Sequence, residues 1–257
     1  MGVKVSPPHI ALKPGERIDA LGGEGLVIIQ KPGLLRFTTD AYLLAAFARP
    51  GRGETILELG SGTGAIVLLL AARSNAAKVT GLEIQPALVE MACRNIALNG
   101  LEARARVLEH DLRRERSLEP PGFGLIVANP PYIPVSAGCR SPSGPLAQAK
   151  HELTCTLRDT VRAAARWLSP KGRFVLVHRP ERLPEIFAEL GHVRFEPKEL
   201  AMVHNGPGAP ACRVLIAARP AARPGLFVHA PLLIRDAAGA FTPGMEEVFA
   251  GQWPSRR

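Results

Sequence analysis

Residues 55–70, TILELGSGTGAIVLLL, place an apolar run, a glycine-rich turn and a second apolar run in immediate succession. The first run predicts a buried strand, and AIVLLLAARS after the turn predicts a helix. Glycines between a strand and a helix let the backbone approach a ligand closely, and the first amides of the helix point toward negative charge. The stretch therefore predicts the first strand and the ligand-binding turn of an open α/β sheet.

The pattern after this turn continues to alternate buried strands with helices. Further strands are predicted in KVTGLEI, RARVLEHD, GLIVANPP and RFVLVH, and a helix in PALVEMACRNIALNG, with Pro86 early and Gly100 just past its end. One helical face precedes the last of these strands, formed by Leu153, Leu157, Val161, Ala165 and Leu168. ELAMVH and CRVLIAA then suit an antiparallel closing pair. The fold class predicted is α/β, a Rossmann-like doubly wound sheet with an antiparallel C-terminal strand pair.

The two ends of the chain add smaller elements to this sheet. Residues 25–37 predict a small N-terminal hairpin around Lys31-Pro32-Gly33, and Thr38 or Thr39 is expected to cap a helix through DAYLLAAFA. Three parts are expected: a hairpin and helix extension at 1–50, the main domain at 51–220, and a tail packed on it at 221–257. Residues 133–150 are long for a connector and suggest a lid or a substrate loop.

Composition narrows the classes of partner and compartment. The 257 residues are 46% apolar, enough for a core, and 32 Lys plus Arg against 23 Asp plus Glu give a net charge of +9. This charge favours a polyanionic partner such as nucleic acid, although a general basic bias of the surface would look the same. Four widely spaced cysteines suggest neither a zinc site nor a disulfide framework. The absence of a signal sequence and of an apolar run of about 18 residues favours a cytoplasmic protein without a membrane partner.

The glycine turn by itself leaves two classes of ligand open. Gly60, Gly62 and Ala65 fit the dinucleotide fingerprint. Glu83, at the end of the second strand, is at the right distance to bind ribose hydroxyls. A nicotinamide enzyme and a methyltransferase both use this arrangement.

Two later strand ends distinguish these classes. Asp111 ends the third strand, where its carboxylate can accept from an adenine amine, or can simply cap a helix in solvent. Asn129-Pro130-Pro131-Tyr132 ends the fourth strand, and a nicotinamide enzyme needs no such element. If the Asn129 side-chain oxygen and the Pro130 carbonyl accept from an aromatic amine, its nitrogen can become more tetrahedral and direct its lone pair at an electrophile. Tyr132 would stack on the base; the alternative is a rigid loop with a buried tyrosine.

Together, these motifs resemble those of a class I S-adenosylmethionine methyltransferase of the amino type. Residues 15–48, 149–183 and 196–218 further resemble the bacterial family of tRNA1(Val) adenine-37 N6-methyltransferases. The resemblance implies S-adenosylmethionine as cofactor, tRNA as partner, and an approach of Thr39 and Asp40 to the cofactor. The Pro- and Gly-rich stretch 135–147 departs from the family and puts the substrate in question.

The residues expected to act fall into two groups, with no metal site. The catalytic group is Asn129, Pro130 and Tyr132, and the cofactor-binding group is Thr39, Asp40, Glu58, Gly60, Gly62, Gly64, Glu83, Asp111 and Asn129. Basic residues that either meet phosphates or are ordinary exposed cations are Lys150, Arg179 and Arg182.

Two other functions are compatible with these motifs. NPPYIP also resembles enzymes that methylate a glutamine side chain in release factors, but those usually carry a longer helical domain before the glycine motif than the roughly 55 residues found here. An inactive RNA-binding module with the same fold would be expected to carry a damaged glycine turn or to lack Asn129.

Overall fold

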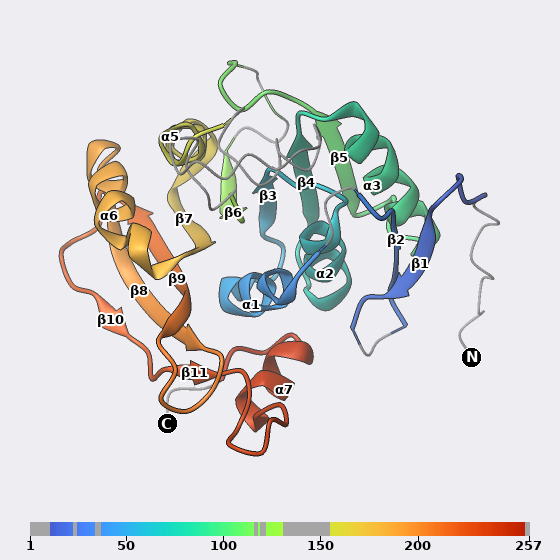
Figure 1. The fold of residues 1–257 in the computed structure, drawn as a ribbon. Helices are drawn as coiled ribbons and strands as arrows, with labels where there is room; N and C mark the ends of the chain where they lie inside the picture. Colours follow the sequence, from blue (N-terminus) through green and yellow to red (C-terminus); the bar gives the residue numbers. More distant parts are fainter. Residues whose placement is uncertain are drawn as a thin grey trace.

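The computed structural model describes residues 11–22, 25–33, 37–115, 118, 122–130 and 155–254 (Figure 1). Within these ranges one large sheet has the strand order β10-β8-β9-β7-β6-β3-β4-β5, and β11 pairs with β8. Its main strands are β3 (Thr55–Leu59), β4 (Lys78–Glu83), β5 (Ala105–Glu109), β6 (Phe123–Ala128), β7 (Leu168–His178), β8 (Phe195–His204) and β9 (Ala211–Pro220). The helices are α1 (Thr39–Ala48), α2 (Ala65–Arg73), α3 (Pro86–Leu98), α5 (Leu157–Trp167), α6 (Leu183–His192) and α7 (Pro243–Phe249), with a short 3-10 helix, η2 (Pro180–Arg182).

The direction of strand order reverses at β3. The chain runs outward from β3 to β4 and β5, then returns to place β6 and β7 on the other side of β3, all in parallel. β9 closes the sheet antiparallel to both β7 and β8. The predicted doubly wound sheet with an antiparallel C-terminal pair is confirmed, and ligands bind such sheets at the carboxyl ends of the strands beside the reversal.

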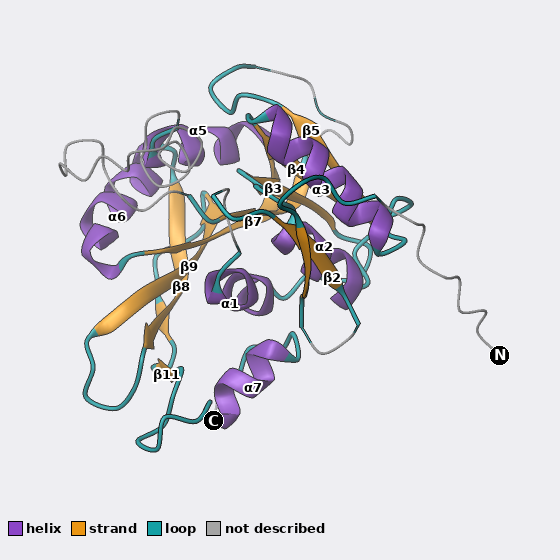
Figure 2. Cartoon of the chain, turned by 45° about the vertical axis from the view of Figure 1, so that its right-hand side comes forward, coloured by secondary structure: helices purple, strands orange, loops and turns teal. Residues whose placement is uncertain are grey.

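Helices cover both faces of the sheet (Figure 2). Leu125 and Val127 of β6 pack in one core cluster with α1, α2 and α7, while Ile126 and Ala128 pack in a second cluster with α5 and α6. Because successive side chains of a strand point to opposite faces, a strand covered on both sides must be apolar throughout. This explains why these segments read as continuous apolar runs.

The N-terminal hairpin exists, but one of its strands was misplaced. β1 (Arg17–Ala20) pairs antiparallel with β2 (Val27–Gln30), so the connection of this hairpin precedes β2. A turn does follow β2 at Pro32-Gly33, as predicted, and residues 34–36 of the expected second arm lie outside the described residues. Asparagine side chains of α3 take the other edge of β2: Asn95 accepts from the Ile29 amide at 2.6 Å, and Asn99 from the Val27 amide at 3.0 Å. The second edge of β2 is thus satisfied by a helix rather than by a following strand.

The helix before β7 has a different buried face from the one predicted. Leu157 and Val161 are buried as expected, but Thr160, Ala164 and Trp167 share their stripe, whereas Ala165 is only half-buried. Leu153 lies outside the described residues. A Thr156–Asp159 capping box begins this helix, α5.

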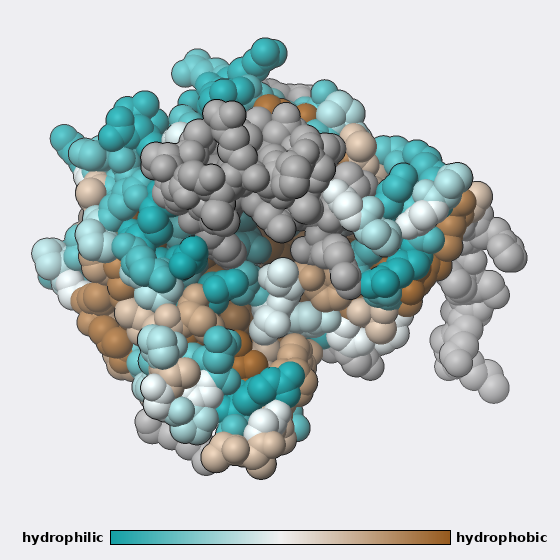
Figure 3. All heavy atoms as spheres, in the orientation of Figure 1, coloured by the Kyte–Doolittle hydropathy of each residue, from teal (hydrophilic) through white to brown (hydrophobic). Residues whose placement is uncertain are grey.

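The C-terminal residues pack against the sheet and α1. β10 (Phe227–Val228) and β11 (Leu232–Leu233) add to β8, and the Trp253 ring contacts the Phe47 ring edge-on at 4.8 Å. Hydrophobic atoms gather at the surface near β10 (Figure 3), where Phe227 and Val228 are 40% and 58% exposed. None of the described helices is long and apolar enough to cross a membrane.

Candidate functional site

Four strand ends bring polar groups to one edge of the sheet. Register pairs Leu59 of β3 with Leu82 of β4 and with Ala128 of β6. The glycine turn after β3, Glu83 at the end of β4 and Asn129 after β6 therefore lie side by side at the carboxyl edge. β5 ends beside Glu83, two residues before Asp111. The structure thus brings together motifs that are up to about 70 residues apart in the chain.

The glycine turn is held open by backbone bonds to β4. Gly60 and Ser61 both donate to the Leu82 carbonyl at 2.9 Å, and Gly60, Gly62 and Gly64 have φ of 74°, 55° and 83°. A Cβ on Gly64 would lie 3.2 Å from the Ala92 Cβ, so Gly64 allows α3 to pack closely. A Cβ on Gly60 would meet no described atom within 4 Å, so space remains over this turn for a ligand.

Glu83 is a buried carboxylate held by three backbone amides. Gly62 donates to its Oε2 at 2.9 Å, while Ile84 and Gln85 donate to its Oε1, each at 3.0 Å. Burial raises the pKa of Glu83, and these amides oppose that rise. A carboxylate has about four acceptor positions, and three of those on Glu83 are taken by these amides. Glu83 can therefore fix the turn and still accept from one ligand hydroxyl group.

Glu58, at the end of β3, is a fully buried acid without a complete set of partners. Its side-chain Oε2 makes no hydrogen bond with any residue that the structure describes. Burial raises the pKa of Glu58 well above its usual range, and the neighbouring Glu83 raises it further. A buried oxygen left unpaired at the sheet reversal fits a site whose ligand supplies a hydrogen-bond donor.

The Asp40 side chain is held by an ion pair with a residue far along the chain. Thr38 caps α1, as one of the two predicted alternatives. The Asp40 side chain, 5% exposed, accepts from Nε of Arg213 on β9 at 2.8 Å. Thr39 is half-buried in the first turn of α1. The expected approach of Thr39 and Asp40 to a cofactor stays a prediction, and Arg213 is a partner that sequence reasoning missed.

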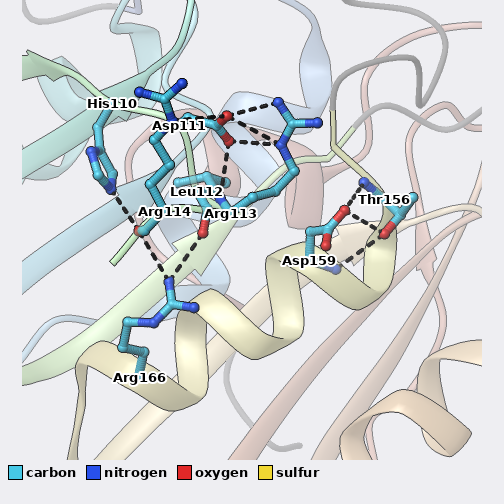
Figure 4. A network of polar contacts seen from close by, with 8 residues as sticks. All are labelled: His110, Asp111, Leu112, Arg113, Arg114, Thr156, Asp159 and Arg166. Carbon is cyan, nitrogen blue, oxygen red and sulfur yellow. Dashed lines mark hydrogen bonds and ion pairs between the residues drawn. The ribbon is translucent and has the colours of Figure 1, made fainter. Parts of the chain in front are cut away.

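Asp111 is ionised and already paired (Figure 4). The Arg113 guanidinium donates from Nε to Oδ1 at 2.9 Å and from Nη2 to Oδ2 at 2.7 Å, and the Arg113 amide donates to Oδ1 at 3.0 Å. Hydrogen bonding to Arg113 lowers the pKa of Asp111 to about 2. An incoming amine would therefore meet a carboxylate that shares its oxygens with an arginine.

The loop that carries Asp111 is fastened to α5. Arg166 donates to the Leu112 carbonyl at 3.1 Å, and its guanidinium lies over the Trp167 ring, 5.3 Å from the centroid. His110 Nε2 lies 3.2 Å from the Arg114 carbonyl and donates to it (Figure 4). These contacts hold Asp111 in position from two sides, and no periodicity in the sequence indicates them.

The Asn-Pro-Pro-Tyr segment is described only in its first half. Asn129 is half-buried and Pro130 is buried, directly after β6. Pro131, Tyr132, the 133–150 loop and Lys150 lie outside the described residues. Two positions beyond the Ala128–Leu176 pair, His178 is fully buried, and burial lowers its pKa to about 4. A neutral imidazole thus lies on the strand next to Asn129, a neighbour that sequence reasoning missed.

Among the described residues, the other side chains that could bind a phosphate or a metal ion either already have a partner or do not lie together. Two of the basic residues suggested for phosphate binding are described. Arg182 is paired with Glu185 at 2.5 Å, so it is less available than Arg179, which is 46% exposed. No group of three or more His, Cys, Asp and Glu in the described ranges is arranged to hold a metal ion.

Comparison with known proteins agrees with this geometry. Residues 38–140 match the family model of the methyltransferase small domain. A Porphyromonas gingivalis protein named tRNA1(Val) (adenine(37)-N6)-methyltransferase is 32% identical over 221 residues, covering 81% of this chain and 85% of the relative. A Parabacteroides distasonis protein of the same name is 33% identical over 192 residues, covering 74% and 80%. A solved Agrobacterium tumefaciens structure, described as a predicted O-methyltransferase, is 29% identical with a TM-score of 0.69, covering 85% of this chain and 99% of that one.

The fold and the site therefore define an S-adenosylmethionine-dependent methyltransferase with a Rossmann-like sheet. Within that class, the chain belongs to the tRNA1(Val) (adenine(37)-N6)-methyltransferase family. The resemblance noted from the sequence is confirmed.

Proposed function

We propose that this protein transfers a methyl group from S-adenosylmethionine to the exocyclic amine of an adenine in tRNA, beside the anticodon. The observation that carries the proposal is the meeting of the glycine turn, Glu83, Asp111 and Asn129 at one edge of the sheet. The names of relatives that cover most of the chain supply the substrate class.

The residues at this edge fit the parts of the cofactor. Glu83 accepts from a ribose hydroxyl, Asp111 accepts from the adenine amine, and the space over Gly60 admits the part of the cofactor that lies against the glycine turn. The Glu58 oxygen that has no partner among the described residues accepts from the ammonium group of the cofactor's methionine part. When bound, the cofactor supplies an electrophilic methyl group on a sulfonium.

Asn129 orients the target amine for an in-line reaction. The Asn129 side-chain oxygen and the Pro130 carbonyl accept hydrogen bonds from the two N–H groups of the amine. This arrangement turns the nitrogen lone pair away from the aromatic ring. Tyr132 stacks on the target base and fixes its plane. These groups act by position and by electrostatics, so no covalent enzyme intermediate is needed.

The alternative functions are not favoured. Relatives at 32% and 33% identity over most of the chain carry tRNA-methyltransferase names rather than protein-methyltransferase names. An inactive module is not favoured because the glycine turn, Glu83 and Asn129 are all present.

The proposal has two further parts. The division at residues 50 and 220 into extension, main domain and tail remains part of it, supported by the pairing of β10 and β11 of the tail with β8 of the main domain. So does a reducing, cytoplasmic setting, supported by the free thiols of Cys93, Cys155 and Cys212 among the described residues.

A labelling experiment tests the substrate class. The protein is incubated with S-adenosylmethionine labelled in its methyl group, separately with unmodified bulk tRNA and with release factor. Label in the RNA, recovered as N6-methyladenosine, is expected. Label in release factor alone would replace the proposal with glutamine methylation, and label in neither would favour an inactive binding module.

A further inference from the structure

A pocket of about 400 Å³ lies at the same sheet edge as Asn129, farther along the sheet. Its walls come from the segment after β7 and from the turn between β8 and β9 (Figure 1), and they include Arg179, Glu181, Asn205, Pro210, Cys212 and Arg213. β7 and β9 pair at His178 and Val214, and β9 is the second strand from β6. At about 4.8 Å per strand, the pocket lies roughly 10 Å across the sheet from Asn129.

The two arginines of this pocket are held differently. Arg213 is fixed in place because its Nε donates to Asp40 at 2.8 Å and its Nη1 donates to the Cys212 carbonyl at 2.7 Å. Arg179 is 46% exposed and pairs at 3.2 Å with Glu181, which is 66% exposed. An exposed pair of this kind contributes little to stability, so the Arg179 guanidinium can exchange Glu181 for another anion at low cost.

The opposite wall is a turn held rigid by the tail. His204 Nδ1 donates to the Ala209 carbonyl at 2.7 Å, which closes the turn on itself. The Ile234 amide donates to the His204 carbonyl at 2.8 Å, and the Arg235 amide to the Asn205 carbonyl at 3.1 Å. The Asn205 side chain therefore extends from a fixed backbone, so the free-energy cost of ordering it when a ligand binds is small.

We propose that this pocket binds a nucleotide that neighbours the methylated adenine in the same RNA strand. The Arg179 guanidinium binds its phosphate, since a planar fork of donors matches phosphate oxygens. The Asn205 amide binds the edge of its base, whose face lies against Pro210 and Cys212. Glu181, released by Arg179, accepts from the ribose 2′-hydroxyl. This inference rests on the proposed function, and it assigns to the pocket the recognition of the sequence around the target.

Two variants and one matched control test the pocket. Arg179→Ala removes the phosphate contact and Asn205→Ala removes the base contact, whereas Arg219→Ala changes an exposed arginine at the opposite end of β9. For each pocket variant, the KM for an anticodon stem-loop RNA is expected to rise about tenfold, with kcat at saturation and the cofactor Kd unchanged. Arg219→Ala is expected to leave all three constants unchanged.

An abasic substrate links the pocket to a particular nucleotide. Stem-loops that lack the base at one position beside the target adenine are compared in wild type and in Asn205→Ala. Removing the base that occupies the pocket is expected to lower the affinity for the stem-loop about tenfold in wild type. In Asn205→Ala the same removal is expected to cause no further loss, because the contact with the base is already absent. For Arg179→Ala, the slope of log affinity against log salt is expected to fall by about 0.7, the loss of one phosphate contact.

The outcomes separate this inference from the proposed function. Methylation of the stem-loop by wild type, with unchanged KM, salt slope and abasic penalties in both pocket variants, would overturn the pocket assignment and leave the proposed function intact. No methylation of any RNA by wild type would overturn the proposed function first. Equal losses in Arg219→Ala would show a general charge effect and would also overturn the assignment.

Discussion

Replacing Glu83 with glutamine tests whether one carboxylate serves both the fold and the cofactor. Both of its oxygens accept from backbone amides, Oε2 from Gly62 and Oε1 from Ile84 and Gln85. A glutamine amide offers one acceptor oxygen and one donor nitrogen, so at least one of these amides would face an NH₂ group. The substitution keeps the shape of the side chain and changes only its hydrogen bonding and charge.

The magnitude of the effect follows from these contacts. A buried donor left without its acceptor costs about 1–3 kcal/mol, and we expect the free energy of unfolding to fall by this amount in Glu83→Gln. Loss of a charge-assisted bond to a ribose hydroxyl is expected, separately, to weaken cofactor binding by about 1.5–3 kcal/mol, or about 10- to 150-fold in Kd.

Urea unfolding measures the first quantity and titration calorimetry with S-adenosylmethionine measures the second. Glu109→Gln is the matched control, because Glu109 is the register partner of Glu83 on β5 but is exposed. Wild-type stability together with wild-type affinity in Glu83→Gln would contradict both roles of the carboxylate. Reduced stability with unchanged affinity would limit Glu83 to holding the turn.

Three further changes probe other parts of the site. Asn129→Ala is expected to lower kcat on the order of 100-fold while leaving the cofactor Kd nearly unchanged; an unchanged rate in a methyl-transfer assay would make the segment a structural turn. Because the pKa of His178 is lowered to about 4, the folded state holds the neutral ring. The stability that comes from burying this neutral ring is complete above pH 6.5 and is lost progressively as the pH falls toward 4. The total loss in the free energy of unfolding is about 3 kcal/mol. His178→Gln is expected to flatten the dependence of unfolding free energy on pH in that window, and an unchanged slope would contradict the assignment. Arg213→Met removes the ion-pair partner that Asp40 has on β9 and is expected to cost on the order of 3 kcal/mol in urea unfolding, whereas Arg219→Met on the same strand should cost little.

The parallel half of the fold could be predicted from the sequence because each of its strands is buried on both faces. The apolar runs, Pro86 and the glycine after β3 mark boundaries that depend on local chemistry alone. β1 was missed because RIDA is largely exposed and has no apolar run. α6 also went unnamed, although Pro184 in its first turn and its buried Ile186 and Leu190 are ordinary helix signals.

The candidate site likewise has parts that could be predicted from the sequence and parts that could not. Glu83 and Asp111 could be placed because each stands at a strand end, and the edges of parallel strands meet. The pairing of Asp40 with Arg213 joins residues 173 positions apart, and no local pattern relates them. Arg113, which donates to the Asp111 carboxylate, is only two residues away in the chain. Whether such a neighbouring cation turns toward a carboxylate depends on the surrounding packing, which here is the packing of the loop that α5 holds.

We propose that the sheet edge that carries Asn129 methylates an adenine amine in tRNA. The most direct test of this proposal maps the product: tRNA from a strain that lacks this protein is incubated with the cofactor and either wild type or Asn129→Ala, then digested, and the fragments are analysed by mass spectrometry. We expect one added methyl group on the N6 of an adenine in the anticodon-loop fragment with wild type, and a strongly reduced yield with the variant. A methyl group on another base or on a ribose, or equal yields from both proteins, would contradict it.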